Sequence, residues 1–414
     1  MANKNGGFIG TDGLDAPDAP TAVTPTAGDT SVSVAFTAPT DTGTSAITGY
    51  VAQVSTDGTA YSAGSGTGTS SPITVSSLSN GTAYTAKVWA INAYGTSAPS
   101  GASSSFTPAT PAYAMVAGFG SGTVNIDRFN IVVQANAADF GDLTVGRNSG
   151  NVMSSSTRTV FSCGRDASNP FFNTLDYVNP TSTGNATDFG DAAYARQFGA
   201  QFGSSTRGFG AGAEGGNQGA PKYQAYDNIG FITFASTGNE TDFGDLTHIC
   251  QVCNGLSSTT RGVRSGGYDG TGGGSTETNV MDYVTMSSAG NATDFGDMTL
   301  ARRSHGACSS ATRGLNAGGY TGSANTNSID YITIASTGNA TDFGDLNDGS
   351  GYSPIGGLNT RAASSPTVAA FIDSGNAIQT ATIASTGNAT DFADLTGTSS
   401  DAFMMNSNAH GGLS

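Results

Sequence analysis

One short phrase recurs along most of this chain of 414 residues, and its repetition restricts the possible folds more than any other feature. Residues 338–346 read GNATDFGDL, and closely similar phrases occur at 184–192 and 290–298. Such a period indicates a repeat architecture, in which neighbouring units bury their apolar faces against one another. The phenylalanine of the phrase falls at intervals of 48 to 54 residues, at Phe140, Phe189, Phe243, Phe295, Phe343 and Phe392.

Each repeat predicts four short strands. An apolar strand such as SIDYITIAS precedes the phrase, and a small-residue stretch, a TRG turn and a run that ends near Gly-Gly follow it. Four short strands per unit are typical of one blade of a β-propeller. The order resembles the kelch-type blade, although Phe stands where that family usually has Trp, and the Gly-Gly pair is intact only at Gly266-Gly267 and Gly318-Gly319. The resemblance covers 112–414 and implies a six-bladed, kelch-like β-propeller.

The two ends of the repeat region predict that strand exchange closes the ring. The region begins at residues 114–120, which align with a second strand. It ends at DAFMMNSNAHGG, which aligns with a first strand and the following turn and places His410 at the arginine position. We therefore expect the segment near 399–409 to pair with the segment near 113–119, which removes a free sheet edge.

Five arginines lie 18 residues after a repeat phenylalanine. Equivalent positions at constant spacing predict a shared contact between blades, whereas a single ligand site needs asymmetry. The repeat phenylalanines are expected to be buried between blades. Aspartates of the phrase, such as Asp188 and Asp191, are expected to pair with the arginines or to cap the turn. The arginines are Arg158, Arg207, Arg261, Arg313 and Arg361.

Length variation between the repeats falls in one loop, between the second and third strands, so one face of the ring varies. Insertions that map to one face often mark a binding face. Aromatic rings among small polar residues suit sugars, whose C–H faces stack on rings; the alternative is that these rings only close long loops. The candidate ligand-binding residues are Asn169, Phe171, Phe172, Lys222, Tyr223, Tyr226, Tyr268, Asp269 and Tyr320.

We expect no enzyme activity, cofactor or metal. The histidines His248, His305 and His410 stand outside any catalytic motif, and the DFG triplets lack the other kinase motifs. A ring of calcium sites at the aspartates is an alternative to a structural role. A zinc site is an alternative reading of Cys250-x-x-Cys253, with His305 and Cys308 nearby, whereas crowding at an inner strand also selects small residues. The recurrent N-x-T triplets fall in tight turns, where Asn and Gly are favoured for their backbone freedom. Turn formation therefore explains these triplets better than glycosylation.

The first third of the chain follows another pattern. Residues 16–108 alternate apolar and polar residues between Pro and Gly turns, as sandwich strands do. This segment resembles a fibronectin type III domain, and Phe36 stands where that family usually has Trp. The resemblance implies an immunoglobulin-like sandwich. It rests on Pro20, Phe36, Pro39, Tyr50, Leu78, Gly81, Tyr84, Val88, Ala90, Asn92, Gly95 and Ser97.

Charge and hydropathy exclude several classes of partner. A formal net charge of −16 argues against nucleic acid, because few cations would neutralise phosphates. No apolar run is long enough for a membrane span, and residues 1–15 lack the apolar core of a signal peptide. Four cysteines are too few for a disulfide framework. The Gly-Gly-Phe-Ile stretch in the tail of residues 1–15 suggests an anchoring peptide that orders on a partner.

A fibronectin-type module before a Gly-, Ser- and Thr-rich propeller is similar to tail-fibre and adhesin virion proteins of marine tailed phages. The repeated sequence phrases resemble those of cyanophage proteins. The resemblance implies an all-β virion protein, made in the host cytoplasm, that binds other tail proteins through the N-terminal tail and recognises a host surface polysaccharide. Two alternatives remain: a purely structural virion component, such as a capsid decoration or tail accessory protein, and a bacterial surface adhesin.

Overall fold

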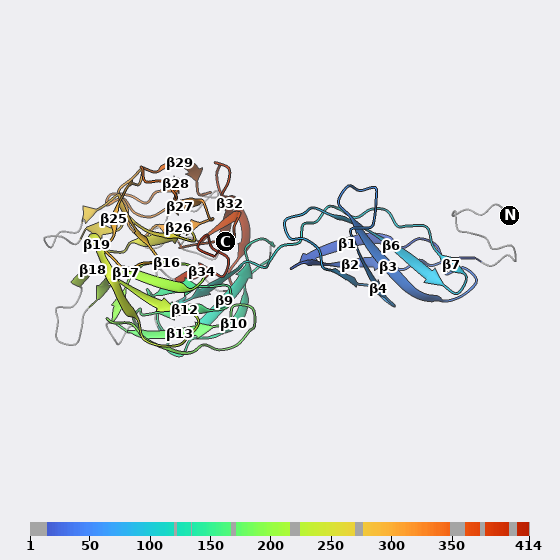
Figure 1. The fold of residues 1–414 in the computed structure, drawn as a ribbon, viewed down its shortest axis with the longest axis horizontal. Coiled ribbons are helices and arrows are strands. Elements are labelled where there is room, and N and C mark those ends of the chain that lie inside the picture. Colours follow the sequence, from blue (N-terminus) through green and yellow to red (C-terminus); the bar gives the residue numbers. More distant parts are fainter. Residues whose placement is uncertain are drawn as a thin grey trace. The chain divides into compact units, whose positions relative to one another are not determined.

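The computed structural model describes residues 15–119, 122–133, 135–166, 171–215, 224–269, 276–347, 361–372, 377–396 and 404–413. Over these residues the protein consists of strands and turns without a helix, so the all-β prediction is confirmed. Consequently no helix in the described part of the chain could cross a bilayer. The chain forms two compact units, Met1–Pro111 and Ala112–Ser414, which Figure 1 colours from blue to teal and from teal to red.

Unit 1 is a sandwich of two antiparallel sheets. One sheet has the order β1 (Thr21–Gly28), β2 (Ser31–Thr37) and β5 (Ile73–Ser76). The other has the order β4 (Gly64–Gly68), β3 (Ile47–Ser55), β6 (Thr85–Asn92) and β7 (Gly95–Thr96).

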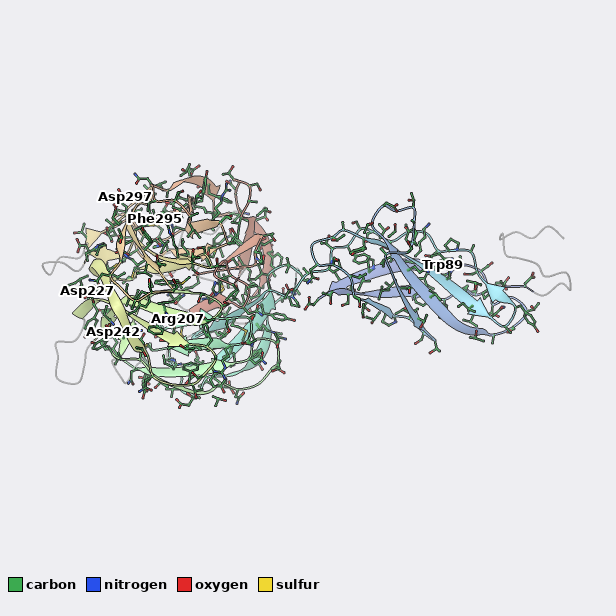
Figure 2. All side chains as sticks on the ribbon, viewed as in Figure 1. Trp89, Arg207, Asp227, Asp242, Phe295 and Asp297 are labelled. Atoms are coloured by element: carbon green, nitrogen blue, oxygen red, sulfur yellow. The ribbon has the colours of Figure 1, made fainter. Side chains whose placement is uncertain are left out.

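Alternation in the sequence sets the inner faces of this sandwich. In β6, TAKVWAIN, every second residue is buried, including Val88, while Trp89 lies on the other face (Figure 2). Phe36, which stands at the family's Trp position, is buried with its ring 4.7 Å from that of Tyr50. An aromatic pair therefore fills the centre of the core.

Unit 2 contains six sheets, here named A to F, and each is built on four antiparallel strands. Sheet A contains β34 (Met404–Ser407), β8 (Tyr113–Ala117), β9 (Asn125–Asn130) and β10 (Ala138–Asp142); B contains β11 (Asn151–Ser154), β12 (Thr159–Ser162), β13 (Thr174–Val178) and β14 (Thr187–Asp191); C contains β16 (Ala200–Gly203), β17 (Arg207–Gly215), β18 (Gln224–Thr233) and β19 (Thr241–Gln251). Sheet D contains β20 (Asn254–Ser257), β21 (Arg261–Ser265), β24 (Val280–Thr285) and β25 (Thr293–Asp297); E contains β26 (Gly306–Ser309), β27 (Arg313–Ala317), β28 (Ser328–Thr333) and β29 (Thr341–Asp345); F contains β30 (Arg361–Ser364), β31 (Val368–Ile372), β32 (Ala377–Thr382) and β33 (Thr390–Asp394).

The last strand of the chain completes the first sheet of unit 2. β34 pairs antiparallel with β8, with Met404 opposite Ala117 and Ser407 opposite Ala114, so the predicted pairing of the two ends is confirmed. The first strands of the six sheets contact one another in the order β11, β16, β20, β26, β30 and β34, and β34 also contacts β11. The contacts between the sheets therefore form a closed cycle.

Serines join neighbouring first strands within this cycle. The Ser309 hydroxyl donates to the Ser257 carbonyl over 2.7 Å, and the Ser364 hydroxyl donates to the Ser309 carbonyl over 2.7 Å. The Ser407 hydroxyl likewise donates to the Ser364 carbonyl. The next serine, such as Ser310, accepts the Arg313 N–H and closes the tight turn into the second strand. The small-residue stretch of each repeat thus supplies both an inter-sheet bond and a turn.

The repeated phrase couples each sheet to the next one. Its GNA half lies in the turn before the fourth strand, and its FGD half lies in that strand. In each pair of neighbouring sheets an Asn side-chain oxygen accepts the backbone N–H of the second Asp from the preceding copy, over 3.0 to 3.3 Å. The Asn of the phrase is therefore needed for an inter-sheet bond as well as for its turn. The pairs are Asn185–Asp142, Asn239–Asp191, Asn291–Asp245, Asn339–Asp297, Asn388–Asp345 and Asn136–Asp394.

The glycine after the repeat phenylalanine permits this close coupling. Gly344 has a φ of +147°, and a Cβ there would lie 2.6 Å from the Gly387 carbonyl oxygen. Four further glycines face the next turn in the same way: Gly141, Gly190, Gly244 and Gly296. The repeat phenylalanines on these strands are 2–3% exposed, whereas Phe392 is only partly buried; Phe295 is labelled in Figure 2.

Buried ion pairs form a second layer between the sheets. Asp330 of β28 accepts the Thr299 hydroxyl over 2.7 Å and lies 3.0 Å from the Arg302 guanidinium, and Thr299 and Arg302 both follow the preceding sheet. Asp176 forms an equivalent pair with Arg147 at 2.9 Å, whereas Asp282 pairs at 2.8 Å with Arg264 of its own sheet and accepts the Thr247 hydroxyl from the preceding sheet. A buried pair held by further hydrogen bonds makes the removal of either partner costly.

Four of the five predicted repeat arginines donate to backbone carbonyls and stack on aromatic rings instead of pairing with the aspartates of the phrase. Arg313 donates to the Ile383 carbonyl over 3.0 Å, and its guanidinium lies 4.3 Å from the centre of the Tyr331 ring. Tyr331 in turn meets the repeat Phe343 edge-on, with ring centres 6.1 Å apart. Arg158, Arg207 and Arg261 make the same two contacts.

Two alignments from the sequence were also wrong. Arg361 begins the first strand β30, and Val368, three residues after the turn serine Ser365, holds the repeat-arginine position in sheet F. The constant spacing failed because the loop before β30 is longer in this repeat. His410 is not at the arginine position of sheet A either, because Tyr113, which precedes Ala114 on β8, occupies it.

Candidate functional site

An extension of three strands marks sheet C, which has seven strands in all. The chain adds β15 (Arg196–Gln197), β22 (Tyr268–Asp269) and β23 (Thr276–Glu277), which gives the order β15, β17, β18, β19, β22 and β23, with β16 also on β17. β22 and β23 lie in the variable loop of sheet D and pair with the end of β19, whereas β15 lies in the connection between sheets B and C and pairs with the end of β17. The long loops therefore form a continuous sheet that spans sheets C and D.

Polar side chains follow one another across this extension. Gln251, Tyr268 and Glu277 are cross-strand neighbours on β19, β22 and β23, and opposed residues share one face of a sheet. At the other end, the Gln197 side-chain amide donates to the Glu214 carboxylate over 2.8 Å. Gln197, Glu214, Gln251, Tyr268 and Glu277 are hereafter called the polar row.

Within the part of the chain that the structure describes, two acceptors in the polar row have no hydrogen-bond partner. The Oε1 atoms of Gln197 and Gln251 are buried without one, although the Gln197 side chain is only 1% exposed. A buried polar atom without a partner costs free energy, so such atoms in a native surface call for a ligand or an ordered water. Both oxygen atoms could accept a hydrogen bond from a hydroxyl group.

An arginine joins two tyrosines at the end of the polar row. The Arg303 guanidinium lies 4.4 Å from the centre of the Tyr268 ring and 4.6 Å from that of Tyr320, and its Nη1 is 2.7 Å from the Glu277 carboxylate. Burial raises the pKa of the Tyr268 hydroxyl. The Glu277–Arg303 pair fixes the rings in place, and both rings remain partly exposed.

The structure brings some of the predicted ligand residues together. Tyr268 and Tyr320 meet through Arg303, which sequence reasoning missed because it follows a structural arginine in the ARRSHG stretch. The Tyr226 ring stacks on the Tyr194 ring, with ring centres 5.6 Å apart. Tyr226 of β18 is the cross-strand neighbour of Cys250 on β19, and Cys250 is in turn the neighbour of Asp269 on β22.

The remaining candidates are placed differently. Phe171 is 7% exposed, so its expected role in an exposed binding loop was wrong; its ring is part of the interior. Phe172 is partly buried, and its carbonyl accepts the N–H of Arg196, the neighbour of Gln197. Asn169, Lys222 and Tyr223 lie outside the described residues.

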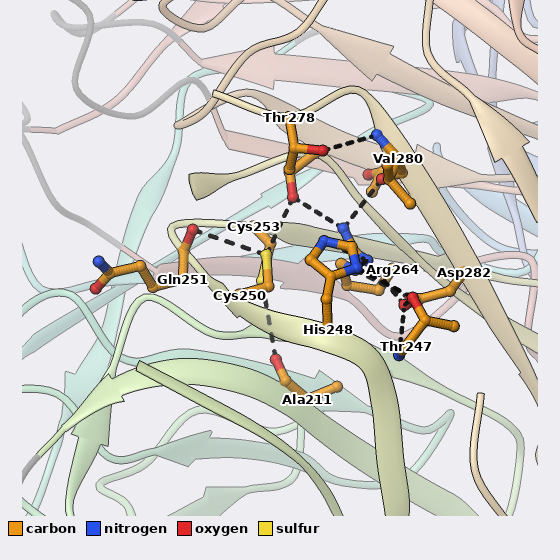
Figure 3. Close-up of polar contacts among 12 residues, drawn as sticks. Ala211, Thr247, His248, Cys250, Gln251, Cys253, Arg264, Thr278, Val280 and Asp282 are labelled. Atoms are coloured by element: carbon orange, nitrogen blue, oxygen red, sulfur yellow. Dashed lines mark hydrogen bonds and ion pairs between the residues drawn. The ribbon is translucent and has the colours of Figure 1, made fainter. Parts of the chain in front are cut away.

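Cys250 lies on β19 within the extended sheet, and Cys253 follows this strand; both are drawn in Figure 3. Cys250 and Cys253 are buried free thiols, and the Cys250 thiol lies 3.2 Å from the Gly266 carbonyl. Burial raises the pKa of Cys250 well above its usual value, whereas a hydrogen bond from Cys250 lowers that of Cys253. The neighbouring His248 has a pKa lowered by burial and by Arg264.

Metal ligation has no geometric support at this segment. His305 places its Nε2 3.0 Å from the Ser265 hydroxyl, and burial lowers its pKa well below the usual value. Among the residues that the structure describes, no three His, Cys, Asp or Glu side chains gather as ligands.

Comparison with known proteins identifies unit 1. Residues 15–106 match the family model of the fibronectin type III domain. This part of the chain is a fibronectin type III domain. The domain includes Asp15, which had been assigned to the N-terminal tail, because the Asp15 carbonyl accepts the Asn92 side-chain amide over 2.9 Å. Residues 1–14 lie outside the described residues.

Solved structures are also similar to part of the chain. The crystal structure of domains A168–A170 from titin shares 30% sequence identity, with a TM-score of 0.22, over 23% of this chain. The match spans 33% of the titin fragment. No curated protein is similar to the chain.

Proposed function

We infer that residues 112–414 form a six-bladed, kelch-like β-propeller and that the protein is a tail virion protein of the fibre or adhesin type. Three features support the propeller: six sheets built on four strands, first strands in cyclic contact, and a first sheet completed by the last strand. The virion assignment continues the resemblance to phage tail-fibre proteins and is tested by mass spectrometry of purified particles.

The ligand that best suits the polar row is a polysaccharide of the host surface. The observation that carries this proposal is two buried oxygens without a hydrogen-bond partner among the described residues, on Gln197 and on Gln251, of which Gln251 is the cross-strand neighbour of the partly exposed Tyr268. Sugar hydroxyls donate to such oxygens, while the C–H face of a pyranose packs on an aromatic ring. Glu214 and Glu277 add acceptors for further hydroxyls.

Glycan binding is tested by the double variant Gln251→Ala/Tyr268→Ala. We expect it to lose adsorption to host cells and binding to extracted surface polysaccharide, with the thermal transition retained. Tyr94→Ala is the matched control, because Tyr94 is a 48% exposed tyrosine of unit 1. If the double variant adsorbs like the parent, the alternative of a purely structural virion component is favoured.

The N-terminal tail is the proposed attachment to other tail proteins. Its Gly6-Gly7-Phe8-Ile9 stretch combines two apolar side chains, which could serve as anchors, with two glycines, the residue type that restricts backbone conformation least. A chain without residues 1–14 should fold, bind glycan and fail to enter particles. Normal incorporation of this variant into particles would place the attachment elsewhere.

A further inference from the structure

A guanidinium occupies the same place at five of the six junctions between neighbouring sheets. In each it donates to the carbonyl of the residue that follows the third strand of the next sheet. The donors and carbonyls are Arg128 to Pro180 at 3.0 Å, Arg158 to Phe234 at 2.7 Å, Arg207 to Met286 at 3.2 Å, Arg261 to Ile334 at 3.1 Å and Arg313 to Ile383 at 3.0 Å.

The sixth junction, between sheets F and A, departs from this pattern at each position. Val368 stands at the arginine position. Thr380 stands at the position of the stacked ring, because it is the third residue from the end of β32, as Tyr331 is in β28. Ile131 is the counterpart of the carbonyl-bearing residues, since its N–H donates to Ala112 as that of Ile383 donates to Thr367. The smaller side chains leave the space of an arginine and a ring unfilled.

An open groove occupies this space. Its volume is about 320 Å³, which is the size of a ligand pocket. Ile131, Val132, Val368, Thr380 and Phe392 line its apolar part, and no arginine is among the described residues of its wall. Val132 is 40% exposed, and the repeat phenylalanine Phe392 is less buried than its five counterparts.

We propose that this groove binds an arginine side chain of a partner protein. Sheet A provides the precedent: Arg128 comes from the third strand, as Thr380 does in sheet F, and its guanidinium lies 5.2 Å from the centre of the Phe140 ring. An incoming guanidinium would stack on Phe392 in the same manner and donate to the Ile131 carbonyl. The exposed Asp391 and Asp394 flank Phe392 and favour a cation.

Arginine suits this place better than lysine. The five occupied junctions combine stacking on a ring with donation to a carbonyl, which a planar guanidinium achieves and an ammonium does not. This inference is independent of the polar row, because the groove lies at the junction of sheets F and A and shares no residue with it.

The test uses the full chain with isotope-labelled Ile and Val methyl groups. Acetyl-Gly-Arg-Gly-amide is titrated against it, with acetyl-Gly-Lys-Gly-amide as the matched probe, and the NMR signals of Ile131, Val132 and Val368 are followed. We expect saturable shifts with the arginine peptide and roughly tenfold weaker binding of the lysine peptide.

Two variants locate the site. Val368→Arg/Thr380→Tyr rebuilds the internal stack and should abolish the shifts at Ile131 and Val132. Phe392→Leu keeps the apolar volume, removes the ring and should weaken binding severalfold; it serves if the double variant does not fold. Equal binding of the two peptides, shifts confined to other methyl groups, or unchanged binding by Phe392→Leu would overturn the proposal.

Discussion

Five junctions join successive sheets from A to F, and they differ from the sixth junction, at which sheet F meets sheet A and the cycle closes. Within the five, a glycine with positive φ faces the next turn, and a guanidinium bridges to the next sheet. At the closing junction Ala393 takes the place of that glycine, Val368 takes the place of the arginine, and a groove opens. The Asn-to-Asp bond, here Asn136 to Asp394, is kept at all six junctions, as is the backbone bond to the carbonyl of the same Asp, here from Ala137.

The five junctions keep their contacts even where the residues change places. In sheet A, Tyr113 and Arg128 exchange the positions that Arg158 and Tyr177 hold in sheet B, and the guanidinium still reaches the equivalent carbonyl. Cys250 stands where Arg302 stands one repeat later, and Arg264 supplies the guanidinium from another strand. Such exchanges indicate that the contact, rather than the position, is what stability requires.

The largest effect is expected from loss of the closing strand. Deleting residues 399–414 removes β34, exposes the edge of β8 and uncovers the core around the buried Met404 and Met405. We expect unit 2 to lose its cooperative calorimetric transition or to aggregate, while the fibronectin type III domain still unfolds cooperatively. A truncated chain with both transitions unchanged would show that closure contributes nothing.

A junction with a buried carboxylate should lose more stability on substitution than a junction with a neutral side chain at the same position. Asp330→Ala leaves the Arg302 guanidinium buried without its counter-charge and should reduce the free energy of unfolding by about 3–5 kcal/mol. Gln379→Ala, at the equivalent position between sheets E and F, removes neutral bonds to the Asn347 backbone and should cost about 1 kcal/mol. Denaturant unfolding measures both; equal losses would contradict the distinction.

Exchange of glycine and alanine tests the spacing of the sheets. Gly296→Ala places a Cβ 2.6 Å from the Gly338 oxygen at a φ of +132°, so we expect a loss of about 1–3 kcal/mol. Ala393→Gly at the closing junction should cost less than about 1 kcal/mol, from backbone entropy alone. A similar loss in both variants would mean that the closing junction is as tight as the others.

The smallest effect concerns pH. Burial lowers the pKa of His305 and His410, so both stay neutral in the folded protein and gain protons on unfolding near pH 6.5. Their contribution to stability is full above that pH and declines as the pH falls toward the folded-state pKa. The unfolding midpoint of unit 2 should therefore decrease as the pH is lowered from 7 to 5, and it should decrease less in the His305→Gln variant. Unit 1, which has no histidine, is the internal control.

Periodicity made the repeats and the closing pair predictable, because a constant spacing between Phe and Arg reflects a constant geometry. It failed at Arg361, where a longer loop brings a different arginine to the counted position. Contacts made by exchanged residues leave no periodic signal, so the Arg128 and Arg264 contacts could not be predicted.

The polar row was only half predictable for a related reason. Tyr268 and Tyr320 stood out as aromatic residues in variable loops, but Gln197 and Gln251 owe their importance to pairing between β15, β17, β19 and β22, which joins distant loops. Length variation indicated the loop that carries Tyr268 and Glu277, and the register of the strands places Gln197 and Gln251 in the same row.

The exchange of Gly230 and Glu240 allows the most direct test of the account. Gly230 stands where Asp176, Asp282 and Asp330 stand in other sheets, and Glu240 of the next turn pairs with Arg196 instead. A Cβ on Gly230 would lie 2.3 Å from the Glu240 carboxyl carbon, so the two positions reach the same point.

Denaturant unfolding of Glu240→Ala and of Gly230→Asp/Glu240→Ala decides whether the contact or the position matters. The single variant should lose about 3–5 kcal/mol because Arg196 stays buried without a partner. The double variant should recover most of that loss, since Asp at position 230 restores the carboxylate in the geometry of the other sheets. A double variant no more stable than the single one would contradict the claim that these junctions are defined by a shared contact.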